Sequence, residues 1–369
     1  MTTINICVIA DQIYKSGGIE RVLSHRINHW IKCDYDVHLI TSENEGNSPY
    51  FFYDSKMIHH DIDGNFDKSL SLFSSANLVM ACKYFFKLKK VLNKISPNVI
   101  IMTNYNYDYY FIPLIANGIY SIKEYHSSFS EQKNIIGKIK RYYTRFYDIH
   151  VFLSQEEKAL HSINNSIVIP NPVNMSKNYP VGLSKRRKTI VTAGRIVSIK
   201  GFERLIEGWS KIAEKYPDWS LEIYGDGEVD YIESLKLLIS KNHLTSSVSI
   251  YPSIPDIVRK MLDSRIYAMS SLTECFPMVL LEAMQARMAV IAFDCPTGPR
   301  NIIDSYKTGI LIEDNNIHEF ANALEKLINN EALAQELADN GFIESQQYDT
   351  GTVMKKWNVL VNKAFNKRQ

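Results

Sequence analysis

INICVIA (residues 4–10) is an apolar run of the kind that is buried on both faces of a parallel sheet. A loop containing Gly17 and Gly18 follows it, and a helical pattern then runs from Ile19 towards Trp30. This order of strand, glycine loop and helix predicts the start of an α/β domain.

Strand-like runs recur through the first half of the chain, with helical periods between most of them. They are DVHLIT (36–41), NVIIMT (98–103), SIKEYH (121–126), DIHVFLS (148–154) and SIVIP (166–170). Strands that alternate with helices favour a parallel sheet covered by helices.

The pattern stops in a Pro-, Asn- and Lys-rich stretch and then restarts. The new runs are TIVTAGR (189–195), SLEIYGDG (220–227), SVSIYP (247–252), RIYAMSS (265–271) and AVIAFDC (289–295). One core rarely serves 369 residues, so we expect two Rossmann-like domains that face each other across a cleft. Their predicted bounds are 1–171 and 189–349, with a linker at 172–188 and an amphipathic helix at 350–369 that packs back on the first domain.

Composition excludes several classes of protein. The formal net charge is +2, so no global field demands a nucleic acid partner. The five cysteines are odd in number, far apart and without a C-x-x-C pair, which argues against disulfides and a zinc site. The start of the sequence lacks signal-peptide features, and no apolar run approaches ~18 residues. We therefore expect a cytoplasmic protein.

The stretch SSLTECFPMVLLEAM (270–284) places two glutamates around a predicted helix start at Pro277. Free N–H groups and the positive dipole end of such a helix suit a diphosphate. Glu274 precedes the helix and Glu282 lies about two turns into it, so each can meet one end of an extended ligand. Surface helices carry such pairs often, and the spacing alone favours no site.

Two cations lie upstream in TAGRIVSIKGFERLI. Arg195 follows a predicted strand, and Lys200 lies in the loop before the next helix. An anionic ligand is expected at the carboxyl ends of strands in an open α/β sheet. For either residue alone, a solvated loop position is the simpler interpretation.

In combination, AGR-x(4)-KG, the strand ending in GDG and residues 270–284 strongly resemble the donor-binding domain of family 4 glycosyltransferases, which have the GT-B fold. GGIERV (17–22) looks like the family's first glycine loop, VIPNPV (168–173) like its domain junction, and EYH (124–126) like its acceptor-side histidine segment. The resemblance covers nearly the whole chain.

The resemblance implies a role for each matching position. Arg195 and Lys200 would neutralise the leaving diphosphate, Glu282 would bind the ribose hydroxyls, and Glu274 would bind the transferred sugar. His126 would lie near the reacting sugar. The remaining donor-binding positions are Gly17, Gly18, Gly225, Cys275, Phe276, Pro277 and Met278. The family retains anomeric configuration, and the Arg–Lys pair would need no metal or cofactor.

The loop CPTGPRN (295–301) departs from the commonest family pattern, in which a glycine pair occurs. This form resembles bacterial transferases that build surface polysaccharides, such as O-antigen or capsule, and lipid-linked oligosaccharides. It favours a UDP-linked hexose or N-acetylhexosamine over GDP-mannose. A lipid-linked saccharide would be the acceptor.

Residues 133–147, KNIIGKIKRYYTRFY, mix cations with rings at helical spacing, as interfacial helices do. We interpret Lys138, Lys140, Arg141 and Arg145 as a contact with the inner leaflet or a lipid pyrophosphate. A solvated helix face with core aromatics is the alternative, and nucleic acid is a weaker one. The similar stretch at residues 82–95 fits a lipid contact and a solvated face equally well.

Other motifs support other chemistry less well. Asp61-Ile62-Asp63 forms a D-x-D, which we interpret as a solvated loop rather than a metal site. G-x-G-x-x-G fails because Asp230 stands at its last glycine, which disfavours a nicotinamide dehydrogenase. The rival functions are a nucleotide-sugar epimerase of GT-B fold and a catalytically silent subunit of a glycosylation complex.

Overall fold

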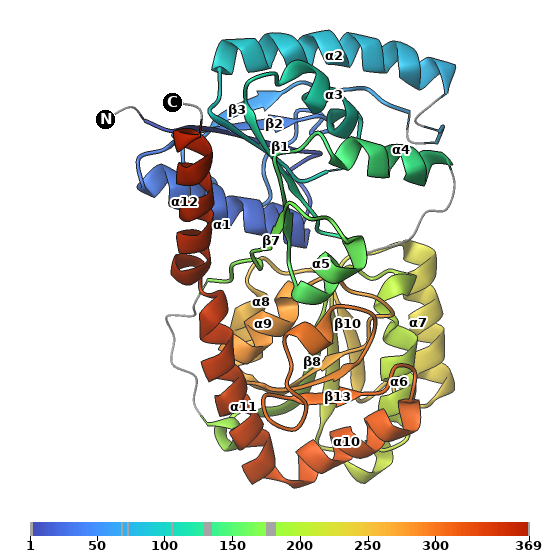
Figure 1. The fold of residues 1–369 in the computed structure, drawn as a ribbon. Coiled ribbons are helices and arrows are strands. Elements are labelled where there is room, and N and C mark those ends of the chain that lie inside the picture. Colours follow the sequence, from blue (N-terminus) through green and yellow to red (C-terminus); the bar gives the residue numbers. More distant parts are fainter. Residues whose placement is uncertain are drawn as a thin grey trace. The chain divides into compact units, whose positions relative to one another are not determined.

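The computed structural model describes residues 3–67, 69–71, 74–104, 106–128, 135–174 and 182–367. It divides into two compact units (Figure 1). Unit 1 comprises Met1–Pro172 and Thr350–Gln369, and unit 2 comprises Val173–Asp349. Both have an α/β fold with a parallel sheet, as the alternation of strands and helices predicts.

Within the described residues, the sheet of unit 1 has seven parallel strands in the order β3-β2-β1-β4-β5-β6-β7. The strands are β1 Asn5–Ala10, β2 Asp36–Thr41, β3 Ile58–Asp61, β4 Val99–Met102, β5 Tyr120–Glu124, β6 Ile149–Phe152 and β7 Ser166–Val168. The helices are α1 Gly18–Lys32, α2 Ser75–Ile95, α3 Tyr107–Ile115, α4 Ile135–Thr144, α5 Gln155–His161 and α12 Thr350–Asn366.

Alternate residues of β1 supply two cores, one on each face of this sheet. Ile6 and Val8 belong to a cluster that includes side chains of α1 and α12. Cys7 and Ile9 belong to a second cluster, with side chains of α2 and α3. Because both faces are covered, β1 needs apolar residues at successive positions, which explains the run at the start of the chain.

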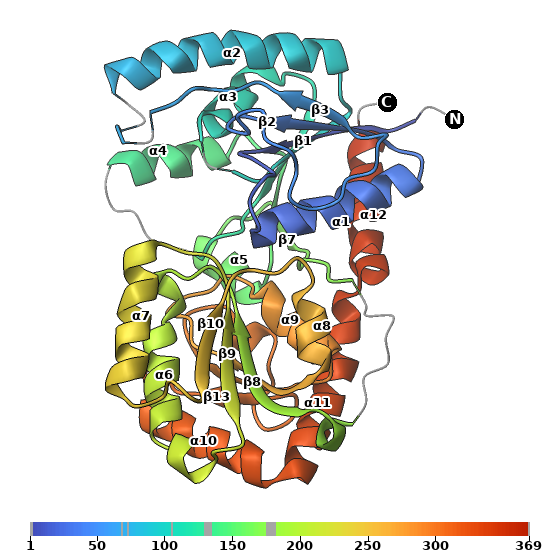
Figure 2. The same cartoon turned by 180° about the vertical axis from the view of Figure 1, so that it is seen from behind.

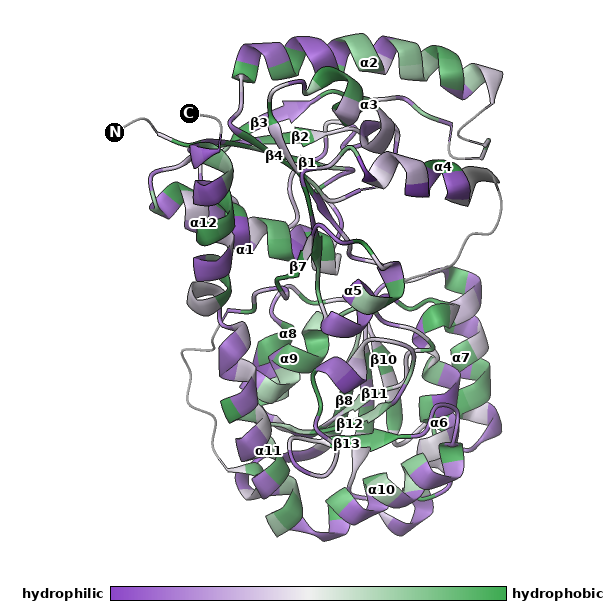
Figure 3. Cartoon of the chain, in the orientation of Figure 1, coloured by the Kyte–Doolittle hydropathy of each residue, from purple (hydrophilic) through white to green (hydrophobic). Residues whose placement is uncertain are grey.

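Strand β3 was not predicted, and the interpretation of Asp61 as a loop residue is wrong. Asp61 ends β3, and its carboxylate accepts hydrogen bonds from the Thr41 hydroxyl at 3.2 Å and the Gly46 N–H at 3.0 Å. The strand reads IHHD, lies at the edge of the sheet and is largely hydrophilic in colour in Figure 3. A polar edge strand has little apolar periodicity from which to predict it.

Helix α12 packs against α1 within unit 1, although more than 300 residues of sequence separate the contacts. Figure 2 shows the two helices beside each other, as Figure 1 does. The rings of Trp30 and Trp357 meet edge to face at a centroid distance of 6.0 Å. Trp357, Leu360 and Val361, which the sequence places on the apolar side of this helix, are buried in the core.

The sheet of unit 2 has six parallel strands among its described residues, in the order β10-β9-β8-β11-β12-β13. The strands are β8 Arg187–Ala193, β9 Ser220–Tyr224, β10 Val248–Tyr251, β11 Ser264–Met269, β12 Ala289–Phe293 and β13 Ile310–Ile312. The helices are α6 Phe202–Ser210, α7 Val229–Lys241, α8 Ile257–Leu262, α9 Met278–Gln285, α10 Ile317–Asn329 and α11 Glu331–Ser345.

The predicted linker extends too far towards the second domain. Strand β8 begins at Arg187 and a 3-10 helix spans Leu183–Lys185, both inside the predicted 172–188 segment. Arg187 and Lys188 are exposed at the start of β8, so their polarity conceals the strand in the sequence. Residues 175–181 of the linker lie outside the described residues.

Among the described residues, no helix is both long enough and apolar enough to cross a bilayer.

We predict that Trp357→Ala lowers the free energy of unfolding of unit 1 by about 3–5 kcal/mol, because it leaves a cavity beside Trp30 and removes a ring from beneath Arg26. Urea unfolding followed by circular dichroism measures the change. Val359→Ala on the same helix is the matched control, because Val359 is 70% exposed, and it should change stability by no more than ~0.5 kcal/mol. Equal stability of both variants would show that α12 contributes little to unit 1.

Candidate functional site

In unit 2, the loops that follow β8 and β11 are bonded to each other. The two strands are parallel neighbours, so both loops leave the same edge of the sheet. The Ser270 hydroxyl donates to the Lys200 carbonyl at 3.0 Å, and the Leu272 N–H donates to the Ile199 carbonyl at 2.8 Å. These bonds therefore hold Lys200 next to the start of the 270–284 stretch, as the predicted site requires.

Lys200 and Glu274 form an ion pair at this edge. Lys200 Nζ lies 2.5 Å from Glu274 Oε1, and the Ser271 hydroxyl donates to the same oxygen at 2.7 Å. The Lys200 and Glu274 side chains are 22% and 14% exposed, so a ligand can reach both. They line a small pocket with Thr192, Ala193, Phe202, Tyr267, Met269, Ser270, Ser271 and Val279.

Arg204 on α6 fixes the turn that carries this pocket. Its guanidinium donates to the carbonyls of Ser270, at 2.7 Å, and Ser271, and to the Asp314 carboxylate at 2.7 Å. It also lies over the Phe293 ring, 4.3 Å from the centroid. Arg204 was not predicted from the sequence, because an arginine on an amphipathic helix is usually interpreted as a solvated cation.

The loop at residues 295–301 supports Glu274 from the other side. The Thr297 hydroxyl donates to the Glu274 carbonyl at 2.9 Å, and the Glu274 N–H donates to the Pro296 carbonyl at 3.4 Å. A Cβ at Gly298 would come within 2.4 Å of the Glu274 Cβ. The loop that departs from the family pattern is thus in direct contact with a predicted site residue.

The other predicted donor-binding residues of unit 2 differ in exposure. Arg195 is exposed, and no ion-pair partner for it occurs among the described residues. Glu282 is buried on α9. Burial raises the pKa of the Tyr267 hydroxyl, and the negative charges of Glu274 and Glu282 raise this pKa further. The residues before and at the start of α9, Cys275, Phe276, Pro277 and Met278, are buried.

Gly225 has a packing reason to be glycine. A Cβ at this position would lie 1.9 Å from the Gly194 carbonyl oxygen. The Gly194 N–H also donates to the Tyr224 carbonyl at 3.0 Å. The glycine therefore allows the loop after β9 to lie directly against the loop that carries Arg195.

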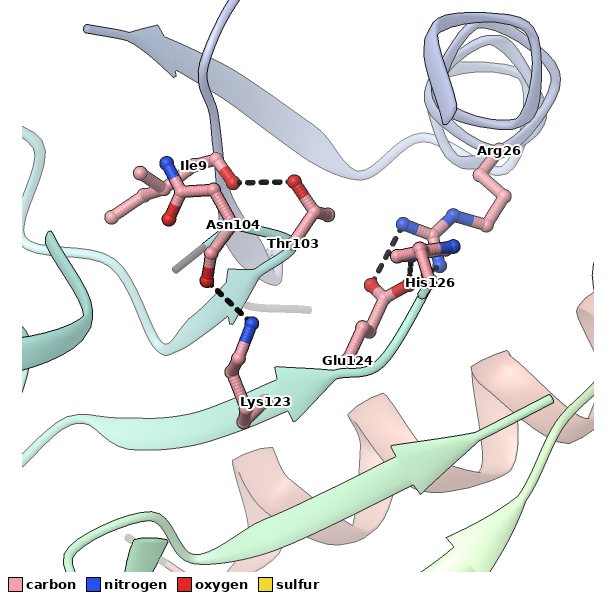
Figure 4. Close-up of polar contacts among 7 residues, drawn as sticks. All are labelled: Ile9, Arg26, Thr103, Asn104, Lys123, Glu124 and His126. Atoms are coloured by element: carbon pink, nitrogen blue, oxygen red, sulfur yellow. Dashed lines mark hydrogen bonds and ion pairs between the residues drawn. The ribbon is translucent and has the colours of Figure 1, made fainter. Parts of the chain in front are cut away.

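In unit 1, the carboxylate of Glu124 at the end of β5 joins Arg26 and His126 (Figure 4). Two hydrogen bonds of 2.8 Å connect Glu124 to Arg26, and His126 Nε2 lies 2.8 Å from Glu124 Oε2. All three side chains are at least 96% buried. Burial alone would raise the pKa of Glu124, but Arg26 and His126 outweigh it and lower the pKa to about 2.

Lys123, the preceding residue of β5, is fully buried and points to another group (Figure 4). Its Nζ donates to the Asn104 carbonyl at 2.5 Å. Burial lowers the pKa of Lys123 to about 7, a fall that the carboxylates of Glu124, Asp11 and Asp108 partly oppose. This lysine was not singled out from the sequence.

Asp11, Asn104, Asn106 and Asp108 form a polar cluster beside Lys123. Amide groups of Asn104 and Asn106 each donate to Asp11 Oδ1 at 2.7 Å. Asn104 also donates to Asp108 Oδ2 at 3.0 Å, and burial is the main reason that the pKa of Asp108 rises to about 6. This cluster was not predicted from the sequence, although Asp11 directly follows β1 and Asn104 closely follows β4.

Gly17 and Gly18 lie at the start of α1, after β1. A Cβ at Gly17 would come within 2.1 Å of Glu20 Oε2, whereas none of the surrounding atoms lies within 4 Å of a Cβ at Gly18. Gly17 is the N-cap and has no side chain to bond the first N–H groups of the helix. The N-cap residue therefore supplies no side-chain cap to α1, and the donor-binding role of Gly17 and Gly18 stays a prediction.

The predicted basic segment lies on and just after α4. Lys138, Arg141 and Arg145 are exposed and Lys140 is half-buried, while Tyr142 and Phe146 are 53% and 45% exposed. The Arg145 guanidinium lies 4.7 Å from the Tyr142 ring centroid. Lys133 belongs to residues 129–134, which lie outside the described residues.

The predicted residues thus fall into one set in each unit. Unit 2 holds Arg195, Lys200, Gly225, Glu274 and Glu282 together with residues 275–278, and unit 1 holds Gly17, Gly18, His126 and the basic segment. In the described part of the chain, no group of three or more His, Cys, Asp or Glu side chains is placed to hold a metal ion. The individual roles of these residues stay predictions.

Comparison with known proteins gives consistent matches. The model of the family "Glycosyl transferases group 1" matches residues 177–343. An uncharacterized glycosyltransferase of Haemophilus influenzae is 30% identical over 362 residues, covering 95% of this chain and 97% of the relative. The amylovoran biosynthesis glycosyltransferase AmsD of Erwinia amylovora is 27% identical over 373 residues, covering 97% and 99%.

Two solved structures show the same fold at low sequence identity. Staphylococcus aureus TarM, in complex with fondaparinux, alpha-GlcNAc-glycerol and UDP, superposes with a TM-score of 0.79 at 15% identity, covering 97% of this chain and 100% of that one. Anabaena Alr3699/HepE, in complex with UDP, superposes with a TM-score of 0.79 at 18% identity, covering 98% and 100%. Both sheets therefore belong to a GT-B fold.

We predict that Glu124→Gln lowers the free energy of unfolding by about 3 kcal/mol at pH 7, because it breaks a buried ion pair with Arg26. The pKa of Glu124 falls from 4.5 to about 2 on folding, so its stabilisation is complete above pH 4.5 and is lost as the pH falls through 2. The difference between parent and variant should therefore shrink between pH 7 and pH 3 in urea titrations.

Glu233→Gln is the control for this measurement, because Glu233 forms an ion pair with Lys236 at an exposed position. It should change stability by less than ~1 kcal/mol at either pH. A difference for Glu124→Gln that does not depend on pH would contradict the low pKa.

Proposed function

The chain belongs to the group 1 glycosyl transferases, and we propose that it transfers a hexose or an N-acetylhexosamine from a UDP-sugar to a saccharide acceptor in bacterial surface-polysaccharide synthesis. The observation that carries the proposal is the Lys200–Glu274 pair in a pocket at the carboxyl edge of the sheet of unit 2. It joins a cation suited to a diphosphate with a carboxylate suited to sugar hydroxyls. The amylovoran transferase among the relatives supports polysaccharide synthesis, and the UDP in the TarM and HepE complexes supports the nucleotide.

On donor binding, Lys200 and Glu274 would each contact a different part of the same ligand. Lys200 and Arg195 would take the diphosphate, and Glu274 would accept hydrogen bonds from hydroxyls of the sugar. Stabilisation of the leaving diphosphate by fixed cations lowers the barrier without a metal ion. We propose that the reaction is independent of metal and retains the anomeric configuration, as is the rule in this family.

Glu282 would bind the ribose from its buried place on α9, and the backbone around residues 275–278 would contact phosphate and sugar. Arg204 and the loop at residues 295–301 would act through Glu274 and its neighbours. Both form hydrogen bonds to the backbone around the pocket, and we propose no direct contact between them and the donor. A nucleotide-sugar epimerase is the alternative function; unlike a transferase, it would convert the donor without any acceptor.

We predict that UDP-sugars raise the melting temperature of the protein more than GDP-sugars do, and that the donor that stabilises most is also the one transferred. Arg195→Ala and Lys200→Ala should each lower turnover by about 100-fold, because each removes an electrostatic stabiliser of the leaving group. Thermal-shift assays and product NMR, in the presence of excess EDTA, measure binding, transfer and configuration.

Lys211→Ala is the control variant, since Lys211 is an exposed cation at the end of α6. It should keep parental turnover, and circular dichroism should match the parent for all variants. Near-parental turnover of Arg195→Ala and Lys200→Ala would remove the donor assignment. Conversion of the sugar without acceptor would favour the epimerase, and an inverted product would contradict retention.

We further propose that the acceptor is a lipid-diphosphate-linked saccharide and that α4 docks unit 1 on the anionic inner leaflet. The support is the exposed combination of Lys138, Arg141 and Arg145 with Tyr142 and Phe146. Rings at the headgroup level and cations near anionic lipid each favour the surface, the cations by about 1 kcal/mol each.

We predict that reversing Lys138, Arg141 and Arg145 to Glu abolishes sedimentation with phosphatidylserine-containing liposomes at moderate salt. Melting-temperature shifts with UDP should not change, because none of the substituted residues is a proposed donor-binding residue. Reversal of Lys236, Lys241 and Lys260 of unit 2 is the charge-matched control and should leave sedimentation intact. Equal sedimentation of both variants, or no sedimentation of the parent, would mean that α4 is a solvated face.

A further inference from the structure

We propose that Arg26 and Glu124 are positioning residues that fix the tautomer of His126, so that its Nε2 carries the proton and its Nδ1 offers a lone pair to a hydroxyl of the substrate. The inference rests on the proposed function for the identity of that hydroxyl-bearing substrate. The geometry of Arg26, Glu124 and His126 in Figure 4 carries the remainder.

The first step is the charge of Glu124. Both of its oxygens accept hydrogen bonds of 2.8 Å from Arg26, a guanidinium that is 1% exposed. A guanidinium is always a donor, so neither carboxylate oxygen can carry a proton towards it. The low pKa of Glu124, about 2, agrees with an ionised carboxylate.

The second step is the position of the proton on His126. An ionised carboxylate only accepts hydrogen bonds, and its Oε2 lies 2.8 Å from His126 Nε2. Nε2 must therefore donate. In the neutral ring the other nitrogen, Nδ1, then has no proton and is an acceptor.

Nδ1 of His126 is buried and has no hydrogen-bond partner among the described residues. Buried polar atoms usually have partners, and Nδ1 belongs to a small set of buried side-chain atoms in the described residues that have none; it lies two residues beyond the end of β5. The carboxyl edge of a parallel sheet is where substrates bind, and a hydroxyl is the group that can donate to this nitrogen.

Arg26 is needed for orientation as well as charge. Its two parallel bonds fix the plane of the carboxylate, and the guanidinium itself is held 4.5 Å from the centroid of the Trp357 ring and 5.6 Å from that of Trp30. A lysine at this position would keep the charge but could not make the fork of two bonds. The pair therefore directs Glu124 Oε2 at the imidazole.

His150 provides an internal comparison within the same sheet. Its Nε2 lies 2.9 Å from the Thr144 carbonyl, which can only accept, and its Nδ1 lies 2.9 Å from the Tyr125 hydroxyl. The same tautomer is thus required at His150, but there both nitrogens have partners. Of these two histidines, only His126 has an unpaired acceptor nitrogen, Nδ1.

Imidazole 15N NMR of the full-length, substrate-free protein tests the inference, with the His126 signals assigned by His126→Gln. In the parent, His126 should be the Nε2–H tautomer with an unprotonated Nδ1. In Glu124→Gln a population with a protonated Nδ1 should appear, because an amide group can also donate to Nε2. The His150 signals should stay unchanged. A parental tautomer at His126 in the variant, or a protonated Nδ1 in the parent, would overturn the proposal.

Kinetics provides the second readout. Glu124→Gln should lower kcat by about 10- to 100-fold with little change in KM for the UDP-sugar, since a misdirected group affects the reacting geometry. Arg26→Lys is the second variant, for the case that Glu124→Gln does not fold. It keeps Glu124 ionised, so His126 should remain the Nε2–H tautomer, while loss of the two-bond fork should give a kcat between those of the parent and Glu124→Gln. Parental kcat in folded variants would contradict positioning. Absence of any transfer by the parent would refute the proposed function but leave the tautomer result valid.

Discussion

Parallel pairing of the strands places all their carboxyl ends at one edge of a sheet, and the candidate sites in both units depend on this constraint. In unit 2, β8 and β11 are neighbours, so Lys200 and Glu274 meet although 74 residues separate them in the chain. In unit 1, β1, β4 and β5 bring Asp11, Asn104 and Glu124 to the same edge. A sheet of mixed direction would scatter these side chains over two edges.

Burial of charge at these edges has a free-energy cost that only pairing can offset. An isolated buried ion is strongly unfavourable, and each such group in the described structure has a charged or hydrogen-bonding neighbour. Arg26 and Glu124 form an ion pair with two hydrogen bonds, and Lys123 donates to the Asn104 carbonyl while the carboxylates of Glu124, Asp11 and Asp108 favour its charged form. Arg204 bonds two carbonyls and a carboxylate. Groups held in this way have little freedom to move, which is what a site that must orient a ligand requires.

The fold class could be predicted from the sequence because alternation of apolar strands with helices is a local signal. The position of Arg195 and Glu274 after strands of the second sheet could be predicted from the sequence, whereas their roles came from the family resemblance and stay predictions. Partnerships between distant residues were out of reach: Arg26 and Glu124 are 98 positions apart, and neither has a sequence pattern that indicates the other. Strand β3 was not predicted for a different reason: its polar residues at the sheet edge form no apolar run.

The discontinuity of unit 1 has a consequence for how the protein is made. A ribosome produces residues 1–172 first and then all of unit 2, before it produces the α12 residues that complete the core of unit 1. Until then the apolar side of α1 around Trp30 and the buried Arg26 lack the Trp357 ring that covers them. Unit 2 is continuous and can fold as soon as it emerges. The order of completion is therefore the reverse of the order of synthesis, and the nascent first unit exposes apolar surface for longer than unit 2 does.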